Sequence, residues 1–206
     1  MNKPRAVLFA ACAAYGLIPA SAQAHLVTSG MGPVYDGISH FGLSPEDFLP
    51  VVALAFFTGL RGATHTRHAL AILCLAWLAG GLTILSGVSL PPFVLPAATV
   101  WLFLLIGIVL AADWNLSPGG CTLLACQLGA VRGAADLAGS AAGPSSALAL
   151  IGMIASVFVV FSLAASVTLP LRRFWMIIAA RVSGSWLAAL GLLFAGWMLR
   201  FGVQVQ

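Results

Sequence analysis

The segment from Asp36 to Pro50, DGISHFGLSPEDFLP, places one histidine among three carboxylates, directly before a long apolar run. His40, Glu46 and Asp47 together offer nitrogen and oxygen ligands, a mixture that suits divalent ions such as Ni²⁺, Co²⁺ or Zn²⁺. We expect Asp36 to attract such an ion on its way to this site. Carboxylates at a membrane boundary are costly unless they have a partner or a function.

The same segment also fits the start of a helix. Ser44 is a favourable cap residue, Pro45 suits the first helical position, and the acids stand in the first turn. Asp47, three residues after Ser44, even resembles a capping box. This alternative explains all of these residues except His40.

A second group of polar residues, THTRH at 64–68, separates two apolar runs. His65 and His68 are three residues apart and would share one face of a helix, where two imidazoles can bind a metal. The alternative is a solvated loop in which Arg67 only sets the topology.

A third group interrupts an otherwise apolar segment. Arg132 and Asp136 are four residues apart, so they can pair with each other on one helix. Buried charges of this kind suggest an ion path or a proton relay. The alternative is a self-satisfied ion pair in the interior of a bundle.

The elements that must position these residues are membrane helices. The chain of 206 residues is 61% hydrophobic and only 7% charged, with a mean hydropathy of +1.07. A membrane-spanning helix needs about 20 apolar residues. We expect six such helices in an all-α bundle, at residues 46–60, 68–86, 93–112, 120–138, 147–169 and 175–199.

The first 24 residues resemble a cleavable signal peptide. Lys3 and Arg5 precede an apolar stretch, and Ala22-Gln23-Ala24 fits a cleavage site. Cleavage would leave residues 25–206 as one transmembrane domain. His25 would then carry a free amino group, and the two nitrogens would form a further metal site.

The arginines predict the orientation. Arg61 and Arg67 lie between the first and second expected helices, and Arg172, Arg173 and Arg181 lie around the start of the sixth. The positive-inside rule puts these loops in the cytoplasm and both ends outside. We therefore expect a multi-pass protein of the bacterial inner membrane with a periplasmic N-terminus. The net charge of +4 serves topology and does not indicate nucleic-acid binding.

Several of these motifs resemble the HupE/UreJ family of membrane proteins, nickel or cobalt permeases linked to hydrogenase and urease maturation. His40-FGLSP-Glu46-Asp47 has the spacing of the family's motif of His, five residues and Asp-His. Ala63-Thr64-His65-Thr66 is similar to its Ala-His-Ser motif, and PPFVLPAATVWLFLLIGIVLAADWNL is similar to its third apolar run.

The chain departs from that family at two places. Glu46-Asp47 replaces the Asp-His pair, which removes one imidazole. Arg132-Gly133 stands where the family has His-Gly, and an arginine cannot bind a metal because it stays protonated.

The resemblance implies a divalent-metal permease for nickel or cobalt, or a metal-handling accessory protein. The alternative is a non-transporting subunit that docks a membrane partner through the Arg132–Asp136 pair and through Gly129 and Gly133, whose spacing permits close helix contact. The sequence does not determine the oligomeric state, and a homo-oligomer is one alternative. Apart from membrane lipid and a divalent ion, it implies no firm cofactor, and no nucleophile–base pair or phosphate-binding loop indicates an enzyme.

Overall fold

The computed structural model describes residues 30–138, 143–168 and 174–201. Within these ranges the chain forms seven helices and no strand, so the expected all-α architecture is confirmed. The expected signal peptide and His25 lie outside the described residues. The helices are α2 (Pro33–Leu43), α3 (Pro45–Arg61), α4 (Ala63–Leu85), α5 (Val94–Ala111), α6 (Pro118–Leu137), α7 (Pro144–Thr168) and α8 (Phe174–Phe201).

Each of the six expected apolar segments corresponds to one helix from α3 to α8. The largest difference is at α4, which begins at Ala63, so His65 and His68 lie in its first turns rather than in a loop. The short helix α2 was not expected. It has only 11 residues and contains Gly37 and Gly42, so its sequence gave little helical signal.

Four helical segments are long and apolar enough to cross a membrane: α4, α5, α7 and Ile177–Arg200 within α8. The pair α2 and α3, bent by 72° at the break, supplies up to one more. The expectation of a membrane protein is therefore supported, but the expected six spans are matched only in part. The reason at α6 is its composition, because glycines, Arg132 and Asp136 lower its hydropathy.

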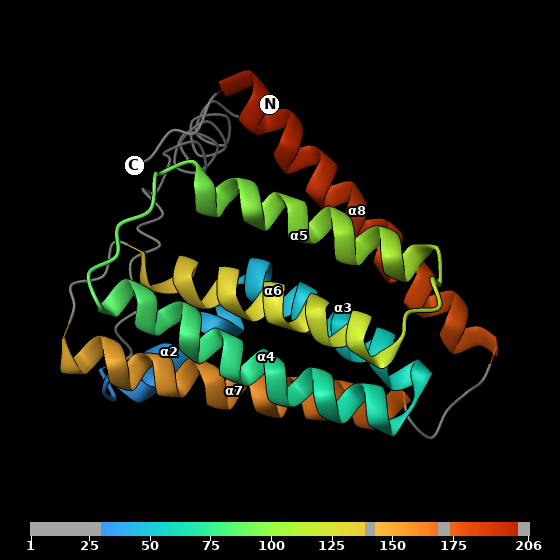
Figure 1. Ribbon diagram of the computed structural model, residues 1–206, viewed down its shortest axis with the longest axis horizontal. Helices are drawn as coiled ribbons and strands as arrows, with labels where there is room; N and C mark the ends of the chain where they lie inside the picture. The colour runs from blue at the N-terminus through green and yellow to red at the C-terminus, as the bar shows by residue number, and fades with distance from the viewer. Residues whose placement is uncertain (1–29, 139–142, 169–173, 202–206) are drawn as a thin grey trace, which may run out of the picture.

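Figure 1 shows α5 and α8 together on one side of the bundle, α3 and α6 in the middle, and α2, α4 and α7 on the other side. The pair α4 and α6 has the most extensive contact. A Cβ at Gly133 would collide with the carbonyl of Trp77, and one at Gly129 with the carbonyl of Leu73. This confirms the close approach expected from the glycine spacing. Small residues make such approach possible in lipid, where the hydrophobic effect does not hold helices together.

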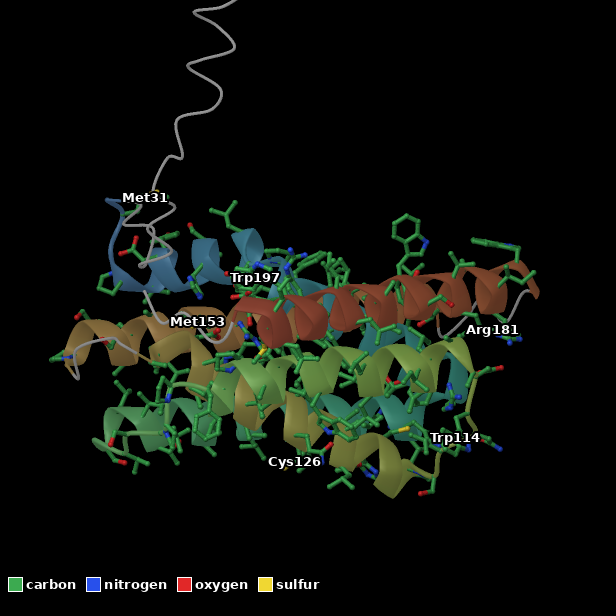
Figure 2. All side chains as sticks on the ribbon, turned by 90° about the horizontal axis from the view of Figure 1, so that it is seen from above. Met31, Trp114, Cys126, Met153, Arg181 and Trp197 are labelled. Carbon is green, nitrogen blue, oxygen red and sulfur yellow. The ribbon has the colours of Figure 1, made fainter. Side chains whose placement is uncertain are left out.

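The outside of the bundle is apolar, as a lipid environment requires. Large apolar side chains project outward in Figure 2, among them Trp197. Leu199 is 89% exposed and Trp186 is 69% exposed. Other exposed residues of this kind are Trp101, Trp175, Leu192 and Leu193.

The two ends of the bundle differ in character. Trp114 and Arg181 lie at one end and Met31 at the other (Figure 2). Arg61 donates hydrogen bonds to Asp113 and to the carbonyl of Trp114, and Arg181 donates to the carbonyl of Ala111. Both arginines therefore gather at the Trp114 end.

The break between α2 and α3 forms an elbow at Ser44. A residue before proline is driven out of the helical region, and Ser44 has φ −91° and ψ 99° before Pro45. Helix α2 thus ends and α3 begins within two residues. The elbow turns the last residues of α2 toward the first turn of α3.

Candidate metal site

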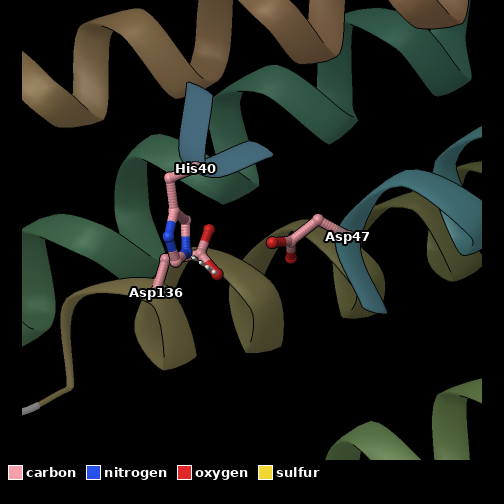
Figure 3. Close-up of side chains that lie close together, drawn as sticks. All are labelled: His40, Asp47 and Asp136. Atoms are coloured by element: carbon pink, nitrogen blue, oxygen red, sulfur yellow. Dashed lines mark ion pairs between the residues drawn. The ribbon is translucent and has the colours of Figure 1, made fainter. Parts of the chain in front are cut away.

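His40, Asp47 and Asp136 converge from three different helices (Figure 3). One potential ligand atom from each lies within 4.8 Å of the others. Asp47 is fully buried, the Asp136 side chain is 1% exposed, and the His40 side chain is 17% exposed. The protein thus holds one imidazole and two carboxylates together in its interior.

Each ligand stands near the end of its helix. His40 lies in the last turn of α2, Asp47 in the first turn of α3, and Asp136 in the last turn of α6. The elbow at Ser44 brings the first two together. Asp136 follows Gly133 by three residues, so the tight glycine packing of α6 on α4 fixes the third.

Arg132 joins the carboxylates to one another. Its Nε donates a short hydrogen bond to Asp47 Oδ1, and its NH2 donates to Asp136 Oδ1 at 3.2 Å and to Glu46 Oε1 at 3.4 Å. Its NH1 donates to Thr99 Oγ1 on α5 at 3.2 Å. The pairing of Arg132 with Asp136 expected from their spacing is confirmed, but the pair is not self-contained.

Two oxygens of this cluster remain without a hydrogen-bond partner among the described residues. They are Asp47 Oδ2 and Asp136 Oδ2, and both are buried. An unpaired carboxylate oxygen in a protein interior costs free energy comparable to a lost charged hydrogen bond. A bound cation is one kind of partner that such oxygens can take.

The net charge of the cluster also favours a bound cation. Three carboxylates, at Glu46, Asp47 and Asp136, face the single guanidinium of Arg132. With His40 neutral the cluster carries a formal charge of −2. A divalent cation would make it neutral.

The spacing of the three candidate ligand atoms can be compared with that in a metal site. With metal–ligand bonds of about 2.1 Å, two ligands of one ion lie at most about 4.2 Å apart. The three candidate ligand atoms lie within 4.8 Å of one another, so a bound ion would have to draw together any pair that lies farther apart than two ligands of one ion. One nitrogen and two oxygens leave further coordination positions for water.

The structure separates the two explanations of the opening segment. Ser44 does stand at the cap position, but its side chain makes no capping hydrogen bond. The capping-box interpretation of Asp47 is wrong, because Asp47 points into the bundle and pairs with Arg132. Glu46 is different: its side chain is 54% exposed, and among the described residues its ion pair with the cluster is to Arg132.

The other predicted ligands lie outside this cluster. Asp36 is one turn before His40 on α2 and is partly exposed. His68 is exposed, and His65 lines a cavity of about 410 Å³ with Arg61 and Asp113. Asp47 and Arg61 are 14 residues apart on α3, so about 21 Å of helix separates the cluster from this cavity.

Asp136 is the candidate ligand that the sequence analysis did not assign to a metal site. Its signal was present, since a charge in an apolar segment is expensive and calls for a partner. The i, i+4 spacing predicted Arg132 as that partner, so the sequence offered no reason to expect a second contact of Asp136 with His40. Asp136 Oδ1 also lies 3.8 Å from His40 Nε2.

Comparison with known proteins adds no assignment. The chain matches no protein-family model, no curated protein and no solved structure.

Proposed function

We propose that this protein binds a divalent transition metal, nickel or cobalt, at His40, Asp47 and Asp136 and passes it across a membrane. The observation that carries this proposal is that two buried carboxylate oxygens, without a hydrogen-bond partner among the described residues, belong to side chains grouped with an imidazole. The resemblance of the first motif to HupE/UreJ proteins supports the same function. So do the several helices long enough to span a membrane.

The ligand types favour a borderline metal. An imidazole suits Ni²⁺, Co²⁺ and Zn²⁺ better than Mg²⁺ or Ca²⁺, which prefer oxygen ligands only. Two carboxylates and one nitrogen bind less tightly than a site of several imidazoles or thiolates. Moderate affinity serves transport, because an ion must leave a site as well as reach it.

The cavity at the Trp114 end is a second polar site along the proposed path of the ion. Arg61, His65, Asp113 and Asn115 line it together with Leu60 and Ile177. The gathering of Arg61 and Arg181 at this end supports a cytoplasmic position for it under the positive-inside rule. The metal cluster would then face the periplasmic side, where His25 and Asp36 would attract the ion.

The alternative is an accessory subunit that docks a membrane partner, but the residues expected to form its docking surface are already in contact with the same chain. Gly129 and Gly133 pack against α4 of the same chain. Arg132 and Asp136 have partners within the cluster. A docking role would require a different face of the bundle.

The test is metal binding by the purified, detergent-solubilised protein, measured by ICP-MS and by calorimetric titration with Ni²⁺, Co²⁺ and Zn²⁺. We expect one site per chain, lost in His40→Ala and Asp136→Asn and retained in His68→Ala. Loss of binding in His68→Ala, with binding retained in His40→Ala, would move the site to α4. Absence of binding by the natural chain would refute the proposed function.

A further inference from the structure

Arg132 is an unusual neighbour for a cation site. Its side chain is 5% exposed and donates to both buried carboxylates of the cluster. A guanidinium keeps its positive charge at any physiological pH. Any ion that binds Asp47 and Asp136 must therefore share them with this charge, or displace it.

The contacts show how the sharing is arranged. Arg132 holds the Oδ1 atoms of Asp47 and Asp136, while both Oδ2 atoms are left without a partner among the described residues. The guanidinium thus occupies one oxygen of each carboxylate and leaves the other available. It already neutralises part of the charge that an incoming ion would otherwise find.

A second set of partners is within reach of the same guanidinium. Thr99 Oγ1 and Glu46 Oε1 accept from its NH1 and NH2. Glu46 is more than half exposed, so it lies at the edge of the cluster. These partners would keep Arg132 paired if a metal drew Asp47 and Asp136 away from it.

We infer that Arg132 is a tethered cation that occupies the carboxylates in the ion-free protein and makes the site selective for doubly charged ions. This inference rests on the proposed function. A singly charged ion such as Na⁺ gains too little from the carboxylates to compete with a guanidinium fixed beside them. A divalent ion gains about twice the Coulomb energy from the carboxylates at the same distance, so it can offset the cost of drawing them away from the guanidinium, which is the same for either ion.

The experiment is a calorimetric Ni²⁺ titration of the detergent-solubilised natural chain and of Arg132→Gln. Each is titrated in NaCl and in choline chloride of equal ionic strength. Arg181→Gln is the matched control, because it removes the same charge at the Trp114 end.

In choline chloride we expect Arg132→Gln to bind Ni²⁺ about tenfold or more tightly than the natural chain. In NaCl part of that gain should disappear, because Na⁺ can now occupy the carboxylates. The natural chain and Arg181→Gln should bind equally in both salts. Equal or weaker Ni²⁺ binding by Arg132→Gln, or a gain that Na⁺ does not reduce, would overturn the inference.

Two further outcomes separate this inference from the proposed function. Binding by Arg132→Gln alone would uphold the tethered cation and refute metal handling by the natural chain. Binding by neither would refute both. If Arg132→Gln does not fold, Arg132→Lys replaces it, since a lysine cannot bridge two carboxylates as a guanidinium does. A smaller gain in the same direction is then expected, and an unchanged affinity would overturn the inference.

Discussion

Asp47 and Glu46 are adjacent acids with the same guanidinium partner, yet we expect their neutral variants to differ strongly in stability. Asp47 is fully buried and receives a short hydrogen bond from Arg132 Nε. Glu46 is 54% exposed and accepts from Arg132 NH2 at 3.4 Å. Asp47→Asn and Glu46→Gln each replace a carboxylate by its own amide. Because the chemical change is the same, a difference in stability between these variants reports the difference in burial.

The expected magnitudes come from these contacts. Asp47→Asn keeps an acceptor for Arg132 but replaces a charged hydrogen bond by a neutral one, a loss of about 1–2 kcal/mol in the free energy of unfolding. Asp47→Ala removes the acceptor and leaves the buried guanidinium with fewer partners, a loss of about 3 kcal/mol. Glu46→Gln should change stability by less than about 0.5 kcal/mol, as for exposed ion pairs.

The assay is equilibrium unfolding of the detergent-solubilised protein by SDS, followed by circular dichroism. EDTA is present throughout, so that bound metal does not contribute. The expected order of destabilisation is Glu46→Gln, then Asp47→Asn, then Asp47→Ala. A loss at Glu46 as large as that at Asp47 would refute the assignment of Asp47 as the buried anchor of the cluster.

Two further predictions concern ligand binding and packing. Saturating Ni²⁺, at about 100 times its dissociation constant, should raise the midpoint of thermal unfolding by about 5–10 °C. Asp136→Asn should abolish that shift, and a full shift in this variant would exclude Asp136 as a ligand. Gly133→Ala should destabilise the protein by about 1–3 kcal/mol, because the added methyl meets the backbone of α4. Gly196→Ala, which meets open space, is the control and should be neutral or slightly stabilising in the same SDS titration; equal losses at both glycines would contradict the close packing of α4 and α6.

Much of the fold could be predicted from local patterns in the sequence. The apolar runs gave every helix from α3 to α8. Ser44-Pro45 gave the start of α3, because a proline limits the conformation of the residue before it. The glycine spacing at Gly129 and Gly133 gave a close helix contact. These features depend on residues near one another in the chain.

The candidate site could be predicted only in part, because it depends on how distant helices pack. His40 and Asp47 were recognised from their spacing, but the elbow that turns them together is a property of α2, whose sequence is short and glycine-containing. Asp136 lies on a helix that local patterns alone could not place beside α2. The spacing of Arg132 and Asp136 revealed their pairing and not their further partners.

The elbow at Ser44 has a consequence for the spacing of two residues of the candidate site. His40 stands on one arm of the elbow and Asp47 on the other, so the angle between α2 and α3 sets the separation of these two ligands. Asp136 is held by the glycine contacts between α6 and α4, and α2 is held in the same way on α7 at Gly37 and Gly152. Ser44 is therefore the point at which a substitution could change the separation of His40 and Asp47 without replacing either side chain.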